Sequence, residues 1–198
     1  MNVVEQLLPK GTGRVLDVGC GNIDVIGLLY CYNRLKKNYD VLGIDINPGE
    51  RENVLKASAL KIPFTNQSIE YVVSFDVIEH IKDFSTALRE MLRITKKRTI
   101  IIAPTTSKPM VRRIINILRR LIGGANSRLG EFLLQGHHYE FFPREILSFK
   151  GRTFRTAFFK IDFPLAGKSF LHRSGLIYAG IYVFERKREK KLKSLENY

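Results

Sequence analysis

The chain has 198 residues, with 33 Lys and Arg against 19 Asp and Glu, which gives a formal net charge of +14. Hydrophobic residues make up 44% of the sequence, so it predicts a packed globular domain rather than a disordered chain. Two cysteines exclude a disulfide scaffold, and no apolar run approaches the roughly 20 residues that span a bilayer. These features indicate a cytoplasmic basic protein. Its excess charge either attracts a polyanion or only solvates the surface.

The first half of the chain alternates between strand-like and helix-like segments. Amphipathic helices are predicted at Ile23–Lys37 and Asp83–Ile94. Such alternation is typical of a parallel sheet with crossover helices on both faces. The predicted strands are Arg14–Gly19, Tyr39–Ile44, a short one near Val54–Ala57, Ile69–Phe75, and Arg98–Ala103, which ends at Pro104.

The C-terminal third has a different pattern. Phe154–Phe163 and Leu176–Glu185 are strand-like, and no helical pattern separates them, so an antiparallel pair is expected. Arg186–Tyr198 is charged and reads as a surface tail. We therefore expect an α/β fold whose mostly parallel sheet ends in two antiparallel strands.

A glycine turn joins the first predicted strand to the first predicted helix. Gly19 and Gly21 would let a ligand approach the backbone closely, and Asp17 adds a carboxylate at the strand end. Asp45 ends the second strand, where an ionised carboxylate can accept hydrogen bonds from both hydroxyls of a ribose. The third glycine of a dinucleotide fingerprint is replaced by Asp24, which would repel a pyrophosphate. A cationic ligand without phosphate suits this turn better.

Several segments lie in order along the first half of the chain: Val15–Asn22, Val41–Pro48, Ile62–Phe64 with Asn66–Ser74, Phe75–Asp83, and Leu88–Arg93 followed by Thr99–Pro104. Together they resemble class I S-adenosylmethionine-dependent methyltransferases of the type 11, small-molecule branch. The resemblance is close over roughly residues 10–105. It implies a Rossmann-like fold with a seven-stranded sheet, and transfer of a methyl group from S-adenosylmethionine.

The resemblance also implies which residues bind the cofactor. These are Asp17, Gly19, Cys20 and Gly21 at the methionine end, Asp45 at the ribose, Ile46, Ser58, Ala59 and Leu60 around the adenine, and Phe75 and Val77 near the sulfonium. Three features depart from the family. Ile23 stands at the third glycine of the turn, Ser58 stands where an acid commonly contacts the adenine, and the helix after Asp45 is truncated. An alternative therefore stays open: a methyltransferase-fold binding module without activity, on RNA or an anionic membrane surface.

Methyl transfer needs a general base only when the acceptor arrives protonated. The candidates lie between Gln135 and Glu145, where the family places a His-aromatic stretch over its substrate pocket: His138 and His137 as base or orienting groups, with Tyr139 beside them. The alternative is a surface loop whose aromatic residues pack on the core. His80 is taken as structural. No His, Cys or acid pattern has metal-ligand spacing.

A basic amphipathic helix is predicted within an insertion at about residues 107–130. Its apolar stripe contains Met110, Val111, Ile114, Ile115, Leu118, Leu121 and Ile122, and its opposite face carries Arg112, Arg113, Arg119 and Arg120. The helix is either a lid packed on the domain or a peripheral contact with an anionic membrane or RNA. We thus expect one domain over residues 1–185 and a charged tail over residues 186–198. The expected acceptor is a small or lipid-linked molecule, and the basic surface would suit an anionic one.

Overall fold

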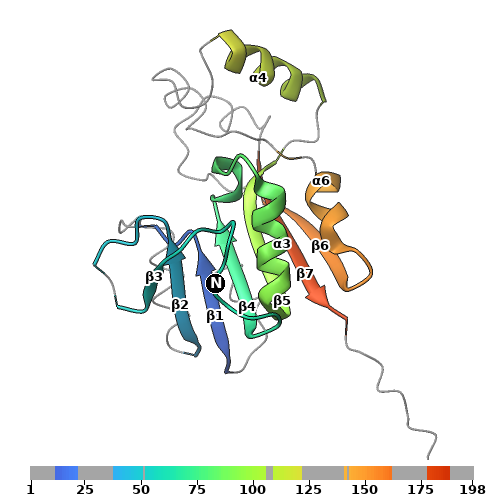
Figure 1. The fold of residues 1–198 in the computed structure, drawn as a ribbon. Helices are drawn as coiled ribbons and strands as arrows, with labels where there is room; N and C mark the ends of the chain where they lie inside the picture. The colour runs from blue at the N-terminus through green and yellow to red at the C-terminus, as the bar shows by residue number, and fades with distance from the viewer. Residues whose placement is uncertain are drawn as a thin grey trace, which may run out of the picture.

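The computed structural model describes residues 12–21, 38–50, 52–105, 109–121, 141, 143–161 and 178–187. Seven strands of these residues form one sheet in the order β3-β2-β1-β4-β5-β7-β6 (Figure 1). The first five strands pair in parallel, and β7 pairs antiparallel with both β5 and β6. The expected fold class is confirmed. The strands are β1 (Arg14–Val18), β2 (Asp40–Asp45), β3 (Val54–Lys56), β4 (Ile69–Phe75), β5 (Thr95–Thr105), β6 (Phe154–Ile161) and β7 (Tyr178–Arg186).

The helices follow the strands in chain order. The described ones are η1 (Ile78–His80), α3 (Phe84–Ile94), α4 (Pro109–Leu121), α6 (Pro143–Leu147) and η2 (Ser148–Lys150). The helix predicted at Ile23–Lys37 lies outside the described residues. None of the described helices combines the length and apolarity that crossing a bilayer requires.

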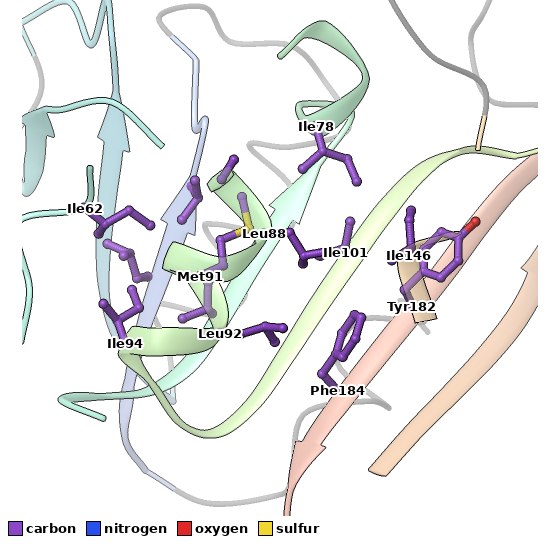
Figure 2. Close-up of a cluster of buried hydrophobic side chains, with 14 of the residues drawn as sticks. Ile62, Ile78, Leu88, Met91, Leu92, Ile94, Ile101, Ile146, Tyr182 and Phe184 are labelled. Atoms are coloured by element: carbon purple, nitrogen blue, oxygen red, sulfur yellow. The ribbon is translucent and has the colours of Figure 1, made fainter. Parts of the chain in front are cut away.

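The α3 helix begins at a side-chain cap and buries one face. The Asp83 carboxylate accepts a hydrogen bond from the Thr86 N–H at 3.0 Å, which satisfies one of the free donors of the first turn. Ala87, Leu88, Met91 and Leu92 recur at helical spacing and are all buried. They belong to one core cluster with side chains of β1, β4, β5 and β7. Figure 2 shows Leu88, Met91 and Leu92 in this cluster, with Ile101 of β5 and Tyr182 and Phe184 of β7. The prediction of this helix is confirmed.

Pro104 does not end the fifth strand as the sequence predicted. The strand continues to Thr105, and Pro104 pairs with Ala179 of β7. The pairing with β4 already ends at Ile102, so beyond that residue β5 has a sheet neighbour on one side only. The carbonyl oxygen of Pro104 accepts a hydrogen bond from the Phe141 N–H at 3.1 Å, on the side away from β7. The missing N–H of the proline falls on that same side, so no ladder bond is lost.

The order of the strands sets where a ligand can bind. β1 lies between β2 and β4, so the chain leaves β1 toward one edge of the sheet and later returns on its other side. Open α/β sheets bind ligands at the carboxyl ends of the strands where the order reverses in this way. The glycine turn after β1, Asp45 at the end of β2 and Phe75 at the end of β4 all lie at this edge.

Candidate functional site

Two glycines of the turn after β1 adopt a left-handed backbone, for different reasons. Gly19 has a φ of 78°, and a Cβ atom at this position would overlap the methyl groups of Val77. Gly21 has a φ of 66°, but a Cβ atom there would meet no other atom within 4 Å. Gly19 is therefore required by the protein's own packing, whereas Gly21 borders open space into which a ligand can reach.

The Asp45 carboxylate holds the loops at this edge together. Its Oδ2 atom accepts a hydrogen bond from the Gly21 N–H at 2.9 Å, and its Oδ1 atom accepts one from the Asn47 N–H at 2.8 Å. The turn is also tied to β2, because the N–H of Gly19 donates to the Ile44 carbonyl oxygen at 2.8 Å. The carboxylate is half-buried and keeps further acceptor positions toward solvent. It can hold the turn and still accept bonds from a ligand.

Two large apolar side chains are exposed on the β2 and β3 side of the turn. Ile46, directly after β2, is 63% exposed, and Leu60, in the loop after β3, is 41% exposed. Ala59 is half-buried beside Leu60. The Ser58 hydroxyl accepts a hydrogen bond from the Leu60 N–H at 3.1 Å, so it shapes the loop. Together these residues form an apolar surface with a polar edge next to Asp45, as a flat aromatic ligand requires.

The end of β4 closes the other side of the turn. Phe75 is buried, and Val77 packs against Gly19. Ser74 is buried as well, and its hydroxyl donates to the Val18 carbonyl oxygen at 3.1 Å, which ties β4 to the start of the turn. Asp17 is also buried, at the end of β1. These contacts fix the spacing between β1 and β4 on which the site depends.

Asp76, between Phe75 and Val77, has a backbone conformation and an environment that the sequence does not reveal. It has a φ of 51°, a backbone region that Asp adopts more readily than most residues. Its side chain reaches solvent, but the surrounding protein limits the hydration of the carboxylate, and this burial raises the pKa of Asp76 to about 6. An acid after a strand is too common a pattern to reveal this, since the backbone conformation is not visible in the sequence.

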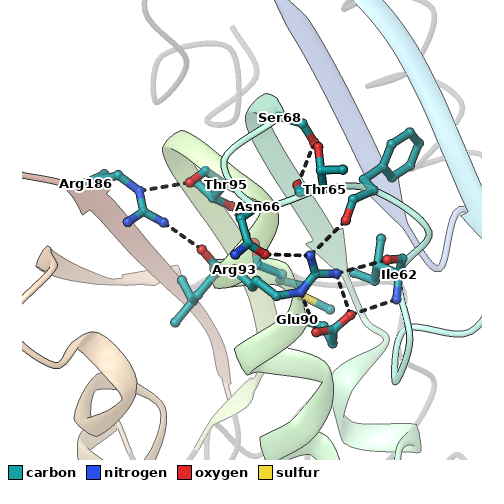
Figure 3. Close-up of polar contacts among 11 residues, drawn as sticks. Ile62, Thr65, Asn66, Ser68, Glu90, Arg93, Thr95 and Arg186 are labelled. Atoms are coloured by element: carbon teal, nitrogen blue, oxygen red, sulfur yellow. Dashed lines mark hydrogen bonds and ion pairs between the residues drawn. The ribbon is translucent and has the colours of Figure 1, made fainter.

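A polar cluster at the C-terminal end of α3 holds the segment between β3 and β4 (Figure 3). Arg93 donates to the carbonyl oxygens of Ile62 and Phe64 at 3.0 and 2.8 Å, and to Asn66 Oδ1 at 3.0 Å. The Glu90 carboxylate accepts from Arg93 at 2.6 Å and from the Ile62 N–H at 2.9 Å. The hydrogen bond from Arg93 lowers the pKa of Glu90. The cluster clamps the chain that follows the loop after β3. An acid–arginine pair on a helix gives no sequence signal for this role, because most such pairs only face solvent.

Residues 16–103 match the family model described as a methyltransferase domain, of type 11. This match supports a class I S-adenosylmethionine-dependent methyltransferase of the type 11 branch. The match covers the glycine turn, Asp45, the end of β4 and α3, which are the segments on which the sequence resemblance rested. The methyl donor of this family is S-adenosylmethionine.

Similar proteins agree with this family. Two probable S-adenosylmethionine-dependent methyltransferases of Mycobacterium tuberculosis are each 29% identical over 111 residues, which cover 54% of this chain but only 40% of theirs. The YcgJ protein of Bacillus subtilis has a TM-score of 0.63 at 15% identity, over 93% of this chain and 97% of that one. A geranyl diphosphate C-methyltransferase of Streptomyces coelicolor has a TM-score of 0.63 at 13% identity, over 93% and 77%. The two structures share the methyltransferase fold with this chain.

The expected site residues of this methyltransferase domain fall into two groups. The structure brings the cofactor candidates together at the carboxyl ends of β1, β2 and β4 and in the loop after β3. The catalytic candidates His137, His138 and Tyr139 lie outside the described residues. Phe141, just beyond them, is described: it is buried, bridges to Thr105 at the end of β5, and packs its ring on Phe84 at 4.9 Å between centroids.

The predicted basic helix exists, but its apolar stripe is not packed as a lid would be. The backbone of α4 matches the expected segment. Arg113 and Arg120 are exposed, and the side chains of Arg112 and Arg119 are not described. Of the described stripe residues, Ile115 is buried, whereas Met110, Ile114, Leu118 and Leu121 are exposed.

Proposed function

We propose that this chain is a cytoplasmic methyltransferase that moves a methyl group from S-adenosylmethionine to a small or lipid-linked acceptor. The observation that carries the proposal is the Gly21–Asp45 arrangement beside the exposed Ile46 and Leu60. A ligand with a ribose and an aromatic base finds there an acceptor carboxylate, open space over a glycine, and apolar side chains. The match covers only 40% of the length of the curated relatives, so the activity of the whole protein is proposed rather than shown.

Each end of the cofactor has candidate partners in this chain. Asp45 would accept hydrogen bonds from the ribose, and Ile46 would pack on the adenine, with Ser58, Ala59 and Leu60 at its edge. Asp17, Gly19, Cys20 and Gly21 would line the methionine end, and Phe75 and Val77 would approach the sulfonium. The buried Asp17 also supplies negative potential near a cationic sulfonium, which favours this ligand over one that carries phosphate.

The bound S-adenosylmethionine would supply an electrophilic methyl group on sulfur. Its transfer is an in-line displacement, so the chain's main task is to align the acceptor and exclude water. For a protonated acceptor, His138 or His137 would take the proton, with Tyr139 orienting the acceptor. The support for this assignment is that Phe141, three residues after His138 in the sequence, is anchored at the end of β5, at the same edge of the sheet as the glycine turn.

The acceptor proposal rests on charge. The chain carries a net charge of +14, with Arg113 and Arg120 exposed on the helix after β5. We propose that Arg112, Arg113, Arg119 and Arg120 attract an anionic acceptor or an anionic surface. The structurally similar geranyl diphosphate methyltransferase was crystallised with such an acceptor, but its 13% identity extends only to the fold. We also propose that residues 1–185 form one domain with its helical insertion at about 107–130, followed by a tail.

An inactive binding module on RNA or a membrane is the alternative. Its support is the departure at Ser58, whose hydroxyl is occupied by the Leu60 N–H. The family match does not favour it. The two functions differ in cofactor binding, which can be measured without knowing the acceptor.

Calorimetric titration with S-adenosylmethionine tests the proposal. We expect saturable binding to the wild-type chain, and its loss in Asp45→Ala, because this change removes the carboxylate that also holds the Gly21 N–H. Asp40→Ala is the matched control, since Asp40 begins the same strand, is exposed and pairs with Arg14 at 2.8 Å. If millimolar S-adenosylmethionine gives neither heat nor a thermal shift, the proposed methyltransferase function is wrong. Equal affinity in Asp45→Ala would refute the assigned ribose site.

A further inference from the structure

The α4 helix turns the larger part of its apolar face to solvent. Exposed fractions are 74% for Met110, 51% for Ile114, 56% for Ile117, 36% for Leu118 and 77% for Leu121. Large aliphatic side chains at this exposure are ordinary when scattered, but these five lie within 12 positions of one helix. They therefore form a continuous apolar surface, which we call the α4 apolar arc.

Helical geometry places this arc on one side of the helix. At about 100° per residue, the five residues span an arc of about 100°, from Ile117 to Leu118. The buried Ile115 lies about 60° beyond Leu118, so the helix rests on the protein along that flank. Arg113 and Arg120 are exposed and lie about 40–60° beyond the other border, next to Ile117. The arc faces outward with positive charge along one side.

The sequence around the arc is depleted of acids. Residues 91–130 contain no Asp or Glu but ten Lys or Arg. The α4 surface combines aliphatic side chains with arginines and has no acid nearby in the sequence. It therefore complements a partner with an apolar interior and an anionic surface. An anionic bilayer has both properties in one continuous surface. A phosphate backbone would use the arginines but leave the aliphatic arc exposed to water.

We propose that α4 docks on an anionic membrane surface, with its apolar arc in the headgroup region and its arginines on anionic lipids. α4 follows β5 and lies beyond the carboxyl ends of β4 and β5 (Figure 1), at the edge that carries Gly19 and Asp45. Docking through α4 therefore turns the candidate cofactor edge toward the lipid. This inference rests on the proposed methyltransferase function and gives its acceptor a class: a lipid or a lipid-linked molecule held at the membrane surface.

Vesicle co-sedimentation of the full chain tests this proposal. We expect it to bind vesicles with about one third phosphatidylglycerol at least about tenfold more tightly than pure phosphatidylcholine vesicles. Ile117→Asp with Leu121→Asp should weaken binding to the anionic vesicles about tenfold or more, because both apolar side chains are removed from the arc. Arg113→Glu with Arg120→Glu should weaken it at least about thirtyfold, since each arginine near the surface contributes about a factor of five.

Matched controls separate the arc from general charge and general apolarity. Arg152→Glu with Arg155→Glu changes the net charge equally at exposed positions outside α4, and Leu55→Asp alters an exposed aliphatic residue of β3. Both controls should bind anionic vesicles like the wild type. Equal losses in the controls would refute a role for α4. If the chain binds RNA through the arginines and without Ile117 and Leu121, RNA is the partner in place of the membrane. If the chain forms a dimer that Leu121→Asp dissociates, a second copy of the chain is the partner.

S-adenosylmethionine titration of the same variants keeps the two proposals apart. Ile117→Asp with Leu121→Asp should bind the cofactor with wild-type affinity, because neither residue belongs to the candidate cofactor site. Loss of vesicle binding with cofactor binding intact supports the docking surface. If the wild-type chain binds S-adenosylmethionine but does not bind anionic vesicles, the docking proposal is wrong and the proposed methyltransferase function is unaffected.

Discussion

The helices α3 and α4 follow successive strands of the sheet and carry apolar residues at the same helical spacing, but they use them differently. α3 buries Leu88 and Met91 against the sheet, whereas α4 leaves Met110 and Leu121 about three-quarters exposed. This difference in exposure separates two regions of the molecule. The core against which α3 packs is closed by contacts within the chain, whereas the helix after β5 presents apolar side chains that the described residues do not cover.

Truncation of one leucine in each helix gives the most direct test of this division. Leu88→Ala should destabilise the fold by about 3–4 kcal/mol, because Leu88 is fully buried in the core against β4 and β5. Leu121→Ala should change stability by no more than about 0.5 kcal/mol, since its side chain is 77% exposed. Urea denaturation of both variants measures the two values. A loss of several kcal/mol in Leu121→Ala would mean that the α4 arc is covered in solution.

The glycine turn allows the same comparison of filled and open space within the candidate cofactor site. Gly19→Ala should destabilise by about 3 kcal/mol, because it combines a strained positive φ with an overlap against Val77. Gly21→Ala should cost only about 1 kcal/mol, since its positive φ is strained but the surrounding space is open. Both should weaken S-adenosylmethionine binding. Equal losses of stability would contradict the packing of Val77 on the turn.

Asp76, directly after β4, should contribute to stability in a way that depends on pH. Its folded pKa of about 6 lies above the unfolded value of about 3.8, so the folded chain binds the proton more tightly. The wild type should lose stability relative to Asp76→Asn as pH rises from about 4 to about 6, with a constant difference above that range. Thermal melts of both proteins at several pH values measure it. A difference that does not vary with pH would show that the Asp76 pKa is not raised.

The strands and α3 could be predicted from the sequence because each is decided by local chemistry. Ile69–Phe75 is a run of β-branched and aromatic residues, and the structure has a strand with those bounds. Asp83 caps α3 through its own carboxylate, three residues from the N–H that it binds. The glycine turn combines positive-φ positions with a strand end, so its position directly after β1 was also predictable.

The remaining features depend on contacts between distant residues. Hydrophobic periodicity identified α4 but cannot say whether the apolar stripe faces the protein, because packed and docking helices share one pattern. Pro104 was expected to end its strand, and it does not, because β4 stops earlier and leaves that side of β5 without a ladder bond. The clamp of Arg93 on Ile62 and Phe64 joins groups about thirty residues apart, and only the fold brings them together.

The position of β7 has a consequence for biosynthesis. It is the last strand of the described chain, yet it lies between β5 and β6 and pairs with both. During translation, β5 and β6 therefore emerge with unpaired edges that stay open until residues 178–186 have left the ribosome. Exposed strand edges promote association with other chains. A nascent chain arrested before Tyr178 would leave the β7-facing edges of β5 and β6 uncovered, so protection of both edges depends on the synthesis of β7.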